Sequence, residues 1–391
     1  MNNRRGDKSP SWLGWVGDMN TITDYLITRP WASVWCVPKA INSILRAVGI
    51  VAFANNPITG FLIMAGMFVG NVNVFWACLL AGVLGVAFSK VLNQPENLIS
   101  DGVVVFNGIL VGCISVAVFP ALSGHQIDSL FWLYVTFAVI VTSYVDKGLN
   151  ALMAASKLPA LSIPFNFSAA IMLLSMRTAA NLEGTQLPEG EGANLTAEVN
   201  ATHEIEWGKV FEGTLLASGQ IYGVGTVDSS ILVWLGFFFF SPLLTVFFYM
   251  GSVIGTMIGV LVSTAPYTDV YLGLWGYNAM LSAGGLSYFL VPLPGVFVAA
   301  IIVASLAGAV QAATVHIFSA TAVPVLSYPF NVATLLFLAI STTENPPFVW
   351  VASKTFPEQH LVKYFSEERR LQNERSLPET EEPLQTVTVG K

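Results

Sequence analysis

The sequence predicts an all-α, polytopic membrane protein built from two inverted repeats. Of the 391 residues, 54% are hydrophobic and only 10% are charged, whereas about 25% of residues are charged in an average soluble protein. Two long apolar blocks flank one hydrophilic insert, and the blocks share motifs in the same order. So few charges cannot cover a water-facing surface. This composition excludes a soluble enzyme, a nucleic-acid-binding protein and a disordered scaffold.

Composition divides the chain into five segments. Residues 1–46 form a polar N-terminal segment, 47–181 the first apolar block, 182–209 the hydrophilic insert, 210–353 the second apolar block, and 354–391 a charged tail. Each block has room for about five helices, because one membrane crossing takes ~20 apolar residues. We expect the tail to be largely disordered, since it is rich in charge and contains proline.

The distribution of charge predicts the orientation of the chain. Six of the 17 Lys and Arg residues lie in residues 1–46, and six more follow the second block. The positive-inside rule therefore places both termini in the cytoplasm. The hydrophilic insert contains two N-glycosylation sequons, at Asn194 and Asn200. They suit an insert that faces the extracellular side of the plasma membrane. Each block then crosses the membrane an odd number of times, so the two repeats must be inverted.

Two motifs recur in the two blocks. The first aligns, in one register, Pro95 with Pro266, Gly102 with Gly273, Asn107 with Asn278, and Leu110 with Leu281. The second aligns Leu158-Pro-Ala-Leu-Ser-Ile-Pro-Phe-Asn166 with Val323-Pro-Val-Leu-Ser-Tyr-Pro-Phe-Asn331. Helix-breaking backbone at membrane depth is tolerated only where it is buried in protein or lines a polar cavity. Because inverted repeats share a site near the bilayer midplane, we interpret the motifs as walls of a central pore.

The motifs offer neutral groups to a solute. They contain the hydroxyls of Ser162 and Ser327, aromatic rings, and carbonyls freed near proline. A small, planar, neutral solute suits them, because a buried amide costs several kcal/mol unless it finds hydrogen-bond partners. The sequence shows no nucleophile–base pair, ATP-binding loop or metal-ligand spacing. We therefore expect no enzyme, cofactor, metal or catalytic residue, and no disulfide among the three cysteines.

At these residues the chain resembles the urea transporter family. The paired Pro-x-x-Ser-x-Pro-Phe-Asn motifs carry the resemblance, together with Phe53-Ala-Asn-Asn-Pro57, Phe106-Asn-Gly-Ile-Leu110, Gly219-Gln-Ile-Tyr-Gly223 and Tyr277-Asn-Ala-Met-Leu281. The resemblance covers roughly residues 40–365. It implies a homotrimer in which each protomer has its own passive urea path. Five spanning helices and one re-entrant pore helix from each repeat would surround that path.

The resemblance also implies the site residues. The slot would be lined by Phe53, Phe106 and Leu110 on one half, and by Ile221, Tyr277 and Leu281 on the other, with Gln220 at one vestibule and Ser162 and Ser327 at the central constriction. The family usually has Thr at the two central positions, so Ser predicts a wider, wetter waist. Ile50 stands at the first-half counterpart of Gln220, which predicts that the two vestibules differ in polarity.

Three functions stay open at this point. The first is a passive urea channel. The second is a channel of the same architecture that conducts mainly water, ammonia or another small neutral amide, which the two Ser residues and Ile50 motivate. The third is an ion- or proton-coupled symporter that uses Glu96 or Asp101. The expected partners are urea and its small neutral analogues, membrane lipid and further copies of the chain, but no nucleic acid.

Overall fold

The computed structural model describes residues 17–123, 126–182, 204–321 and 323–375, and these residues are almost entirely helical. The predicted all-α class is confirmed. Among the described residues, the extended structure consists of one isolated antiparallel bridge between Leu290 and Trp350. The sequons at Asn194 and Asn200 lie outside the described residues.

The helices follow the same order in the two halves of the chain. The first half contains α2 (Cys36–Ile50), α3 (Pro57–Gly70), α4 (Val72–Val91), α5 (Glu96–Ser100), α6 (Phe106–Ser123), α7 (Ser129–Met153), the 3₁₀ turn η1 (Ala154–Ser156) and α8 (Ile163–Leu182). The second contains α9 (Trp207–Gln220), α10 (Val227–Phe240), α11 (Pro242–Val262), α12 (Thr268–Tyr271), α13 (Gly276–Phe289), α14 (Pro294–Ser319) and α15 (Tyr328–Ile340). Outside this pattern lie α1 (Asn20–Ile27) and α16 (Pro357–Arg375).

Four helices in the described part of the chain are long and apolar enough to cross a membrane: α4, α7 extended to Ser156, α11 and α14. Shorter apolar helical stretches of 10–17 residues lie within α3, α6, α8, α10 and α15. The expectation of about five crossings in each block stays a prediction. Capping side chains explain the breaks. Asn56 accepts hydrogen bonds from the first turn of α3, and Asn71 and Ser241 cap α4 and α11 directly after the preceding helices end.

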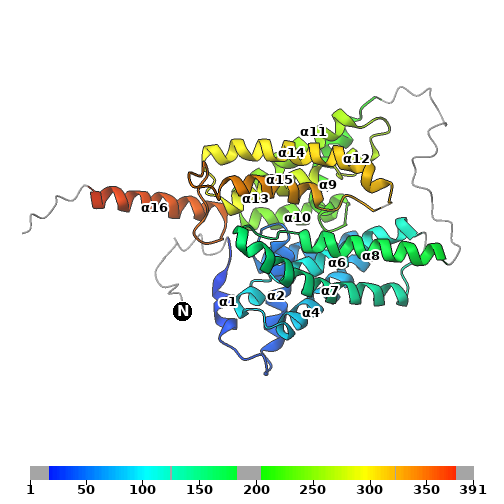
Figure 1. Cartoon of the computed structure of the whole chain (residues 1–391), viewed down its shortest axis with the longest axis horizontal. Coiled ribbons are helices and arrows are strands. Elements are labelled where there is room, and N and C mark those ends of the chain that lie inside the picture. Colours follow the sequence, from blue (N-terminus) through cyan, green and yellow to red (C-terminus); the bar gives the residue numbers. More distant parts are fainter. Residues whose placement is uncertain (1–16, 124–125, 183–203, 322, 376–391) are drawn as a thin grey trace, which may run out of the picture.

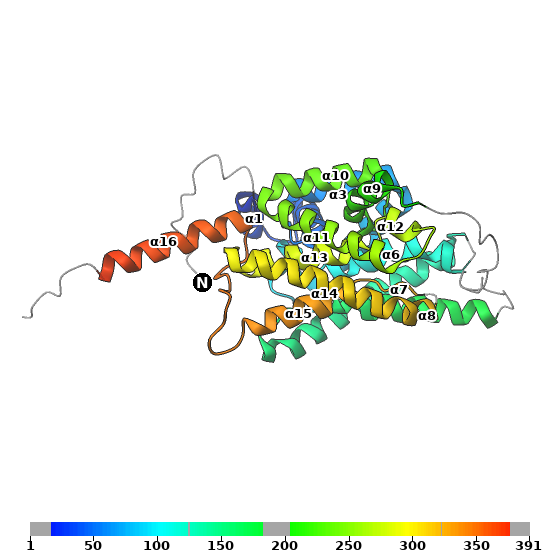
Figure 2. The ribbon, with the colours of Figure 1, turned by 90° about the horizontal axis from the view of Figure 1, so that it is seen from above.

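The two halves pack closely against each other. Figure 2 shows α10 lying beside α3, where the Thr59 hydroxyl donates a 2.8 Å hydrogen bond to the carbonyl of Gly236. The Tyr222 hydroxyl donates to the carbonyl of Val48 at 3.0 Å. Within the second half, α11 approaches α13 through Gly251, where an added Cβ would lie 2.5 Å from the carbonyl oxygen of Ala279. Side-chain hydroxyls therefore join the two halves, and small residues let helices within a half approach closely, where lipid gives no hydrophobic driving force between helices.

The bundle has two distinct ends (Figure 1). At the tail end, α1 lies beside the helices and α16 projects away from the bundle, and at the insert end α8 finishes and α9 begins. The expectation of a largely disordered tail is wrong for residues 357–375, which form α16. Its first turn is anchored, because the Glu358 carboxylate accepts hydrogen bonds from the Ser241 hydroxyl at 2.6 Å and from the Leu243 amide at 2.7 Å.

The N-terminal segment is also held at the tail end. The buried Arg46 guanidinium donates to the carbonyls of Asp18 and Met19 at 2.7 and 3.0 Å. The Asn56 side-chain amide donates to the carbonyl of Gly17. Phe356 lies directly against Gly17, so the two terminal segments meet.

Contact between α16 and the bundle should weaken in acid. His360 is buried, its Nε2 accepts from the Thr355 amide at 3.0 Å, and burial followed by the charge of Lys363 lowers its pKa from 6.5 to about 4. The released segment would bind a proton first as pH falls, so docking is strongest above about pH 6.5 and weakens toward pH 4. We expect faster hydrogen exchange over residues 355–365 at pH 5 than at pH 7.5, after correction for intrinsic rates.

The matched control is His360→Gln, which keeps an acceptor and removes the titrating group. This variant should lose the pH dependence, whereas His316→Gln should keep it. An unchanged pH dependence in His360→Gln would contradict the assignment to His360.

Candidate functional site: a two-fold bend between the halves

Two equivalent chain bends meet in the middle of the molecule. Leu161 and Leu326 have φ values of 48° and 50°, and α8 and α15 begin after the next residue, Ser162 or Ser327. A leucine in this left-handed region costs ~1–2 kcal/mol, so the surroundings must hold it in place. The two Ser hydroxyl oxygens lie 2.6 Å apart and share a hydrogen bond. The N-termini of α8 and α15 therefore face each other.

Each bend is held by an asparagine of the other half. The Asn331 amide donates to Ser162 Oγ at 3.0 Å, and its Oδ1 accepts from the Ser162 backbone N–H at 3.1 Å. Asn166 makes the same pair of bonds with Ser327, again at 3.0 and 3.1 Å. We call Ser162, Ser327, Asn166 and Asn331 the waist. Its four members satisfy one another's polar groups across the boundary between the halves.

A second pair of asparagines supports the bends from behind. Asn107 Nδ2 donates to the carbonyl of Leu161 at 3.3 Å, and Asn278 Nδ2 donates to that of Leu326 at 3.1 Å. The Asn107 amide also donates to the buried carboxylate of Asp146 at 2.8 Å. In the second half, Asn278 donates to an amide oxygen instead, that of Gln311, at 3.1 Å. The strained carbonyls are thus satisfied in both halves by equivalent groups.

A cavity of about 1020 Å³ leads to the waist. Ser162 and Ser327 lie in its lining with the rings of Phe165 and Phe330. Other lining residues come from α12 and the C-terminal end of α14, both of which lie at the insert end (Figure 1). The lining is mostly apolar and aromatic with a few convergent polar groups, as in typical small-molecule sites.

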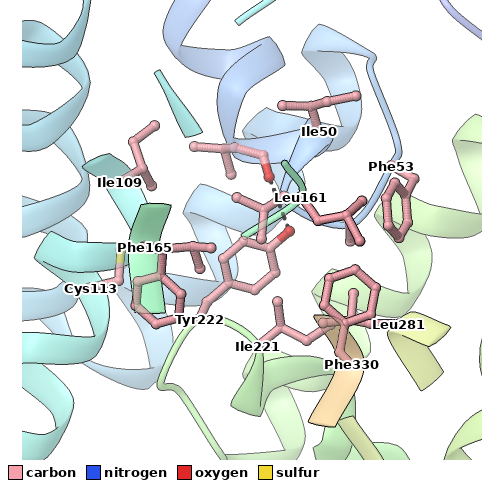
Figure 3. Packing of buried hydrophobic residues seen from close by; sticks show 14 of the residues in the cluster. Ile50, Phe53, Ile109, Cys113, Leu161, Phe165, Ile221, Tyr222, Leu281 and Phe330 are labelled. Atoms are coloured by element: carbon pink, nitrogen blue, oxygen red, sulfur yellow. Dashed lines mark hydrogen bonds between the residues drawn. The ribbon is translucent and has the colours of Figure 1, made fainter. Parts of the chain in front are cut away.

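Most of the residues predicted for the site lie around this cavity. Seven of the nine are in its lining: Leu110, Ser162, Gln220, Ile221, Tyr277, Leu281 and Ser327. Phe53 and Phe106 are not. The Phe53 ring packs near that of Phe330, with the two ring centroids 6.0 Å apart (Figure 3). Phe106 is half-buried at the start of α6 and packs against the core.

Tyr277 is less available to a solute than the sequence suggested. Its hydroxyl donates a 2.5 Å hydrogen bond to the carbonyl of Leu326, so it is engaged in holding the second bend. Phe106, its counterpart in the first half, has no hydroxyl. The ring of Tyr277 faces the cavity, and its polar atom belongs to the bend.

The predicted difference in vestibule polarity needs a correction. Gln220 Nε2 donates to the carbonyl of Leu272 at 2.8 Å, and its first-half counterpart Ile50 has no donor. However, Asn55 Nδ2 donates at 3.1 Å to the carbonyl of Asp101, which corresponds to Leu272. An amide therefore reaches the equivalent carbonyl in both halves. It comes from a neighbouring position, which side-by-side alignment of Ile50 and Gln220 does not reveal.

The two vestibules differ instead in what binds these amides. The oxygen of the Asn55 side chain accepts a 2.8 Å hydrogen bond from the Arg46 guanidinium. The Gln220 side chain lies in the cavity lining, and it fills the space that a side chain at Gly225 would need. The Gln220 amide is therefore open to the cavity, whereas that of Asn55 is part of an ionic anchor.

The wider, wetter waist stays a prediction, and the structure shows how its two hydroxyls lie. Serine lacks the methyl group of threonine, and the two hydroxyls come close enough to bond to each other at 2.6 Å. A solute that passes between them must replace this hydrogen bond with its own.

Sequence reasoning did not assign a role to the four asparagines of the bends. Asn107 and Asn278 were aligned as a repeat pair, and Asn166 and Asn331 end the second motif. This recurrence is the signal that could have identified them. An asparagine that occurs at equivalent buried positions of two repeats is expected to hydrogen-bond a nearby polar group in each repeat. Within the described residues no group of three or more His, Cys, Asp or Glu residues could hold a metal ion, and the three cysteines are free.

Comparison with known proteins agrees with this geometry. A family model described as "Urea transporter" matches residues 41–342. Urea transporter 1 of Rattus norvegicus is 30% identical over 381 residues, which cover 92% of this chain and 91% of that protein. The proteins of the same name from Capra hircus and Ovis aries are 30% and 29% identical over 384 residues, which cover 92% of the chain and 92% of each relative.

Loss of one waist amide should destabilise both bends. In Asn331→Leu, the Ser162 amide would lose its acceptor while still buried, at a cost of about 1–3 kcal/mol. We expect Asn166→Leu to cost about the same, and the double variant to cost less than the sum, because both amides hold one shared pair of hydroxyls. The measurement is thermal unfolding in detergent. Asn73→Leu, at an exposed position, is the control, and full additivity would contradict the shared waist.

Proposed function

The chain belongs to the urea transporter family, and from this premise we propose that it is a passive channel for urea. The waist at the foot of the cavity is the observation that carries the proposal. Ser162, Ser327, Asn166 and Asn331 present only neutral hydroxyl and amide groups. The family is non-enzymatic, so the expectation that the chain is not an enzyme is confirmed.

The electrostatics of the waist favour a neutral solute. The N-termini of α8 and α15 meet there, and each helix N-terminus carries roughly +0.5 of an elementary charge. No ionised side chain is bonded to the hydroxyls of Ser162 or Ser327 within the described residues. Two positive dipole ends without a counter-charge repel cations, and a hydrated ion would lose its water against the rings of Phe165 and Phe330.

Urea has the groups that this waist can exchange. Its N–H groups can donate to Ser162 Oγ and Ser327 Oγ, and its oxygen can accept from the amides of Asn166 and Asn331. Each new bond contributes about 0.5–1.5 kcal/mol net, which offsets the loss of the bond between the two hydroxyls. Its plane fits beside the rings of Phe165 and Phe330 in the cavity lining. Passage then needs no counter-ion and follows the urea gradient.

The architecture and location belong to the same proposal. Two inverted repeats of five spanning helices and one re-entrant pore helix, with the boundaries drawn from composition, are supported by the matching helix order. The charge bias supports cytoplasmic termini, and the two sequons support an extracellular, glycosylated insert in the plasma membrane. Assembly as a homotrimer rests on the family resemblance.

Replacement of Ser327 by two isosteric side chains tests the role of its hydroxyl. Ser327→Thr keeps the oxygen and Ser327→Val replaces it with a methyl group of the same size. Because only the oxygen differs, we expect about tenfold lower urea permeability in the Val variant than in the Thr variant. A tenfold change corresponds to ~1.4 kcal/mol, which is the size expected for the loss of one hydrogen bond between neutral groups. Stopped-flow shrinkage of proteoliposomes gives the permeability. Equal urea permeability in the two variants would remove Ser327 from the mechanism.

The closeness of the two hydroxyls favours one alternative, a channel of the same fold for a smaller neutral solute. The hydroxyl oxygens of Ser162 and Ser327 lie 2.6 Å apart. Water or ammonia would need to push them apart less than the larger urea molecule would. Parallel measurement of urea, methylurea, acetamide, ammonia and water fluxes in one preparation decides between them. We expect urea and acetamide to compete with each other, and a preparation that conducts water and ammonia but not urea would favour the alternative.

The geometry disfavours the ion-coupled symporter. Glu96 is paired with Lys39 at 2.6 Å and Lys90 at 3.0 Å, and Trp31 also donates to its carboxylate. Asp101 interacts with the Arg46 guanidinium at the tail end. Both of these acids are engaged in anchors outside the cavity lining, so neither supplies the carboxylate on the pathway that a coupling site requires. The carboxylate that does lie in the lining is Asp269.

A further inference from the structure

Equivalent positions at the two ends of the pathway carry side chains of very different size. α6 and α13 align through the asparagine-bearing motif at their N-termini, so Ala117 of α6 corresponds to Tyr288 of α13, and Val118 to Phe289. Ala117 and Val118 are half-buried and line the cavity. Tyr288 and Phe289 are only 6% and 4% exposed. The mouth at the insert end is therefore open at the level where the mouth at the tail end is filled.

The chain turns that pack on these positions differ in the same way. Phe53 and Gly223 follow α2 and α9 with φ values of 60° and 75°, so both occupy the equivalent left-handed position. An added Cβ on Gly223 would lie 2.6 Å from the Cβ of Ala117. In the other half, the rings of Phe53 and Tyr288 pack with their centroids 5.3 Å apart. The same contact joins a glycine and an alanine at one mouth, and two aromatic rings at the other.

Phe289 completes a cluster of three rings at the tail end. Its centroid lies 5.8 Å from that of Phe53 and 5.2 Å from that of Tyr288, both in edge-on geometry. Gly285 leaves room for Phe53, because a Cβ there would lie 3.3 Å from the Cζ atom of the ring. The Phe53 ring also lies 6.0 Å from Phe330, which lines the cavity beside the waist. The cluster therefore stands directly behind the waist.

The segment after α15 holds this cluster from outside. The Trp350 ring packs edge-on against Phe289 at 6.1 Å, and Lys354 Nζ lies 5.0 Å from the centroid of the same ring. The backbone N–H of Val351 donates to the carbonyl of Phe289 at 3.2 Å. The position of Phe289 is thereby fixed, and Tyr288 packs on both Phe53 and Phe289.

We propose that Phe53, Tyr288 and Phe289 form an aromatic constriction at the tail-end mouth, and that Tyr288 sets the size of solute that passes. The inference rests on the proposed function, because it deepens the specificity of the same pathway. A solute that leaves the waist toward the tail end meets three buried rings where the opposite mouth offers an open cavity. The constriction excludes bulkier amides by size, and the ring of Tyr288 must swing aside for each solute.

Truncation of Tyr288 tests the constriction through solute size. Tyr288→Ala removes the ring contacts with Phe53 and Phe289, whose spacing is typical of aromatic pairs. Because the constriction would then be wider, we expect about tenfold higher permeability to N,N′-dimethylurea and a smaller rise for urea. Tyr288→Phe keeps the ring and should not show this preferential rise for N,N′-dimethylurea. Tyr249→Ala is the matched control, because Tyr249 is 37% exposed and packs against Trp234, outside the cluster of three rings. An unchanged ratio of the two permeabilities in Tyr288→Ala, or the same rise in Tyr288→Phe, would overturn the size-limiting role.

A second measurement does not depend on which solute is transported. Ser327→Cys, in a chain whose three native cysteines are replaced, places a thiol at the waist for reaction with a methanethiosulfonate reagent in oriented vesicles. We expect reaction from the insert side alone, and reaction from both sides after Tyr288→Ala is added. Reaction from the tail side without that change would overturn the constriction, as would failure of Tyr288→Ala to permit it. If the thiol behaves as expected while no variant conducts urea, the constriction stands and the proposed function fails.

Discussion

The structure depends on satisfying backbone groups where two helices begin in the interior of a membrane protein. A helix start leaves N–H groups without partners, and lipid offers none. Here each bend takes its partner from the opposite half, because Asn331 binds the amide of Ser162 and Asn166 binds that of Ser327. Neither bend is complete alone. This mutual dependence explains why the two motifs are so similar and why the halves must meet at this one place.

The near two-fold symmetry makes the departures from it informative. The groups that support the bends are of the same type in both halves, because an asparagine side chain donates to each leucine carbonyl. The groups that shape the mouths are not. Phe53 faces Tyr288 where Gly223 faces Ala117, and Arg46 anchors the N-terminal segment at the tail end. Polar satisfaction thus constrains the centre strictly, whereas packing at the two ends has been free to diverge.

The sequence predicted the class of the fold and the centre of the site, and it failed where geometry decides. Hydropathy and repeated motifs identify an all-helical membrane protein and align Ser162 with Ser327, because both signals are local in the chain. The residue that hydrogen-bonds the backbone at the first vestibule is Asn55 and not Ile50, the aligned counterpart of Gln220, and no local sequence pattern indicates this. It depends on which side chain reaches the carbonyl of Asp101 across the turn. The bond between the two serine hydroxyls depends likewise on a distance that no residue type specifies.

The fixed centre also bears on how a solute could move through the protein. The waist asparagines tie the two halves together by hydrogen bonds in both directions, so a rocking motion of one half against the other would break all of them at once. The narrow points are made by side chains instead, namely the hydroxyls of Ser162 and Ser327 and the ring of Tyr288. Rotation of side chains is orders of magnitude faster than movement of whole domains. The architecture therefore favours channel-like passage over alternating access.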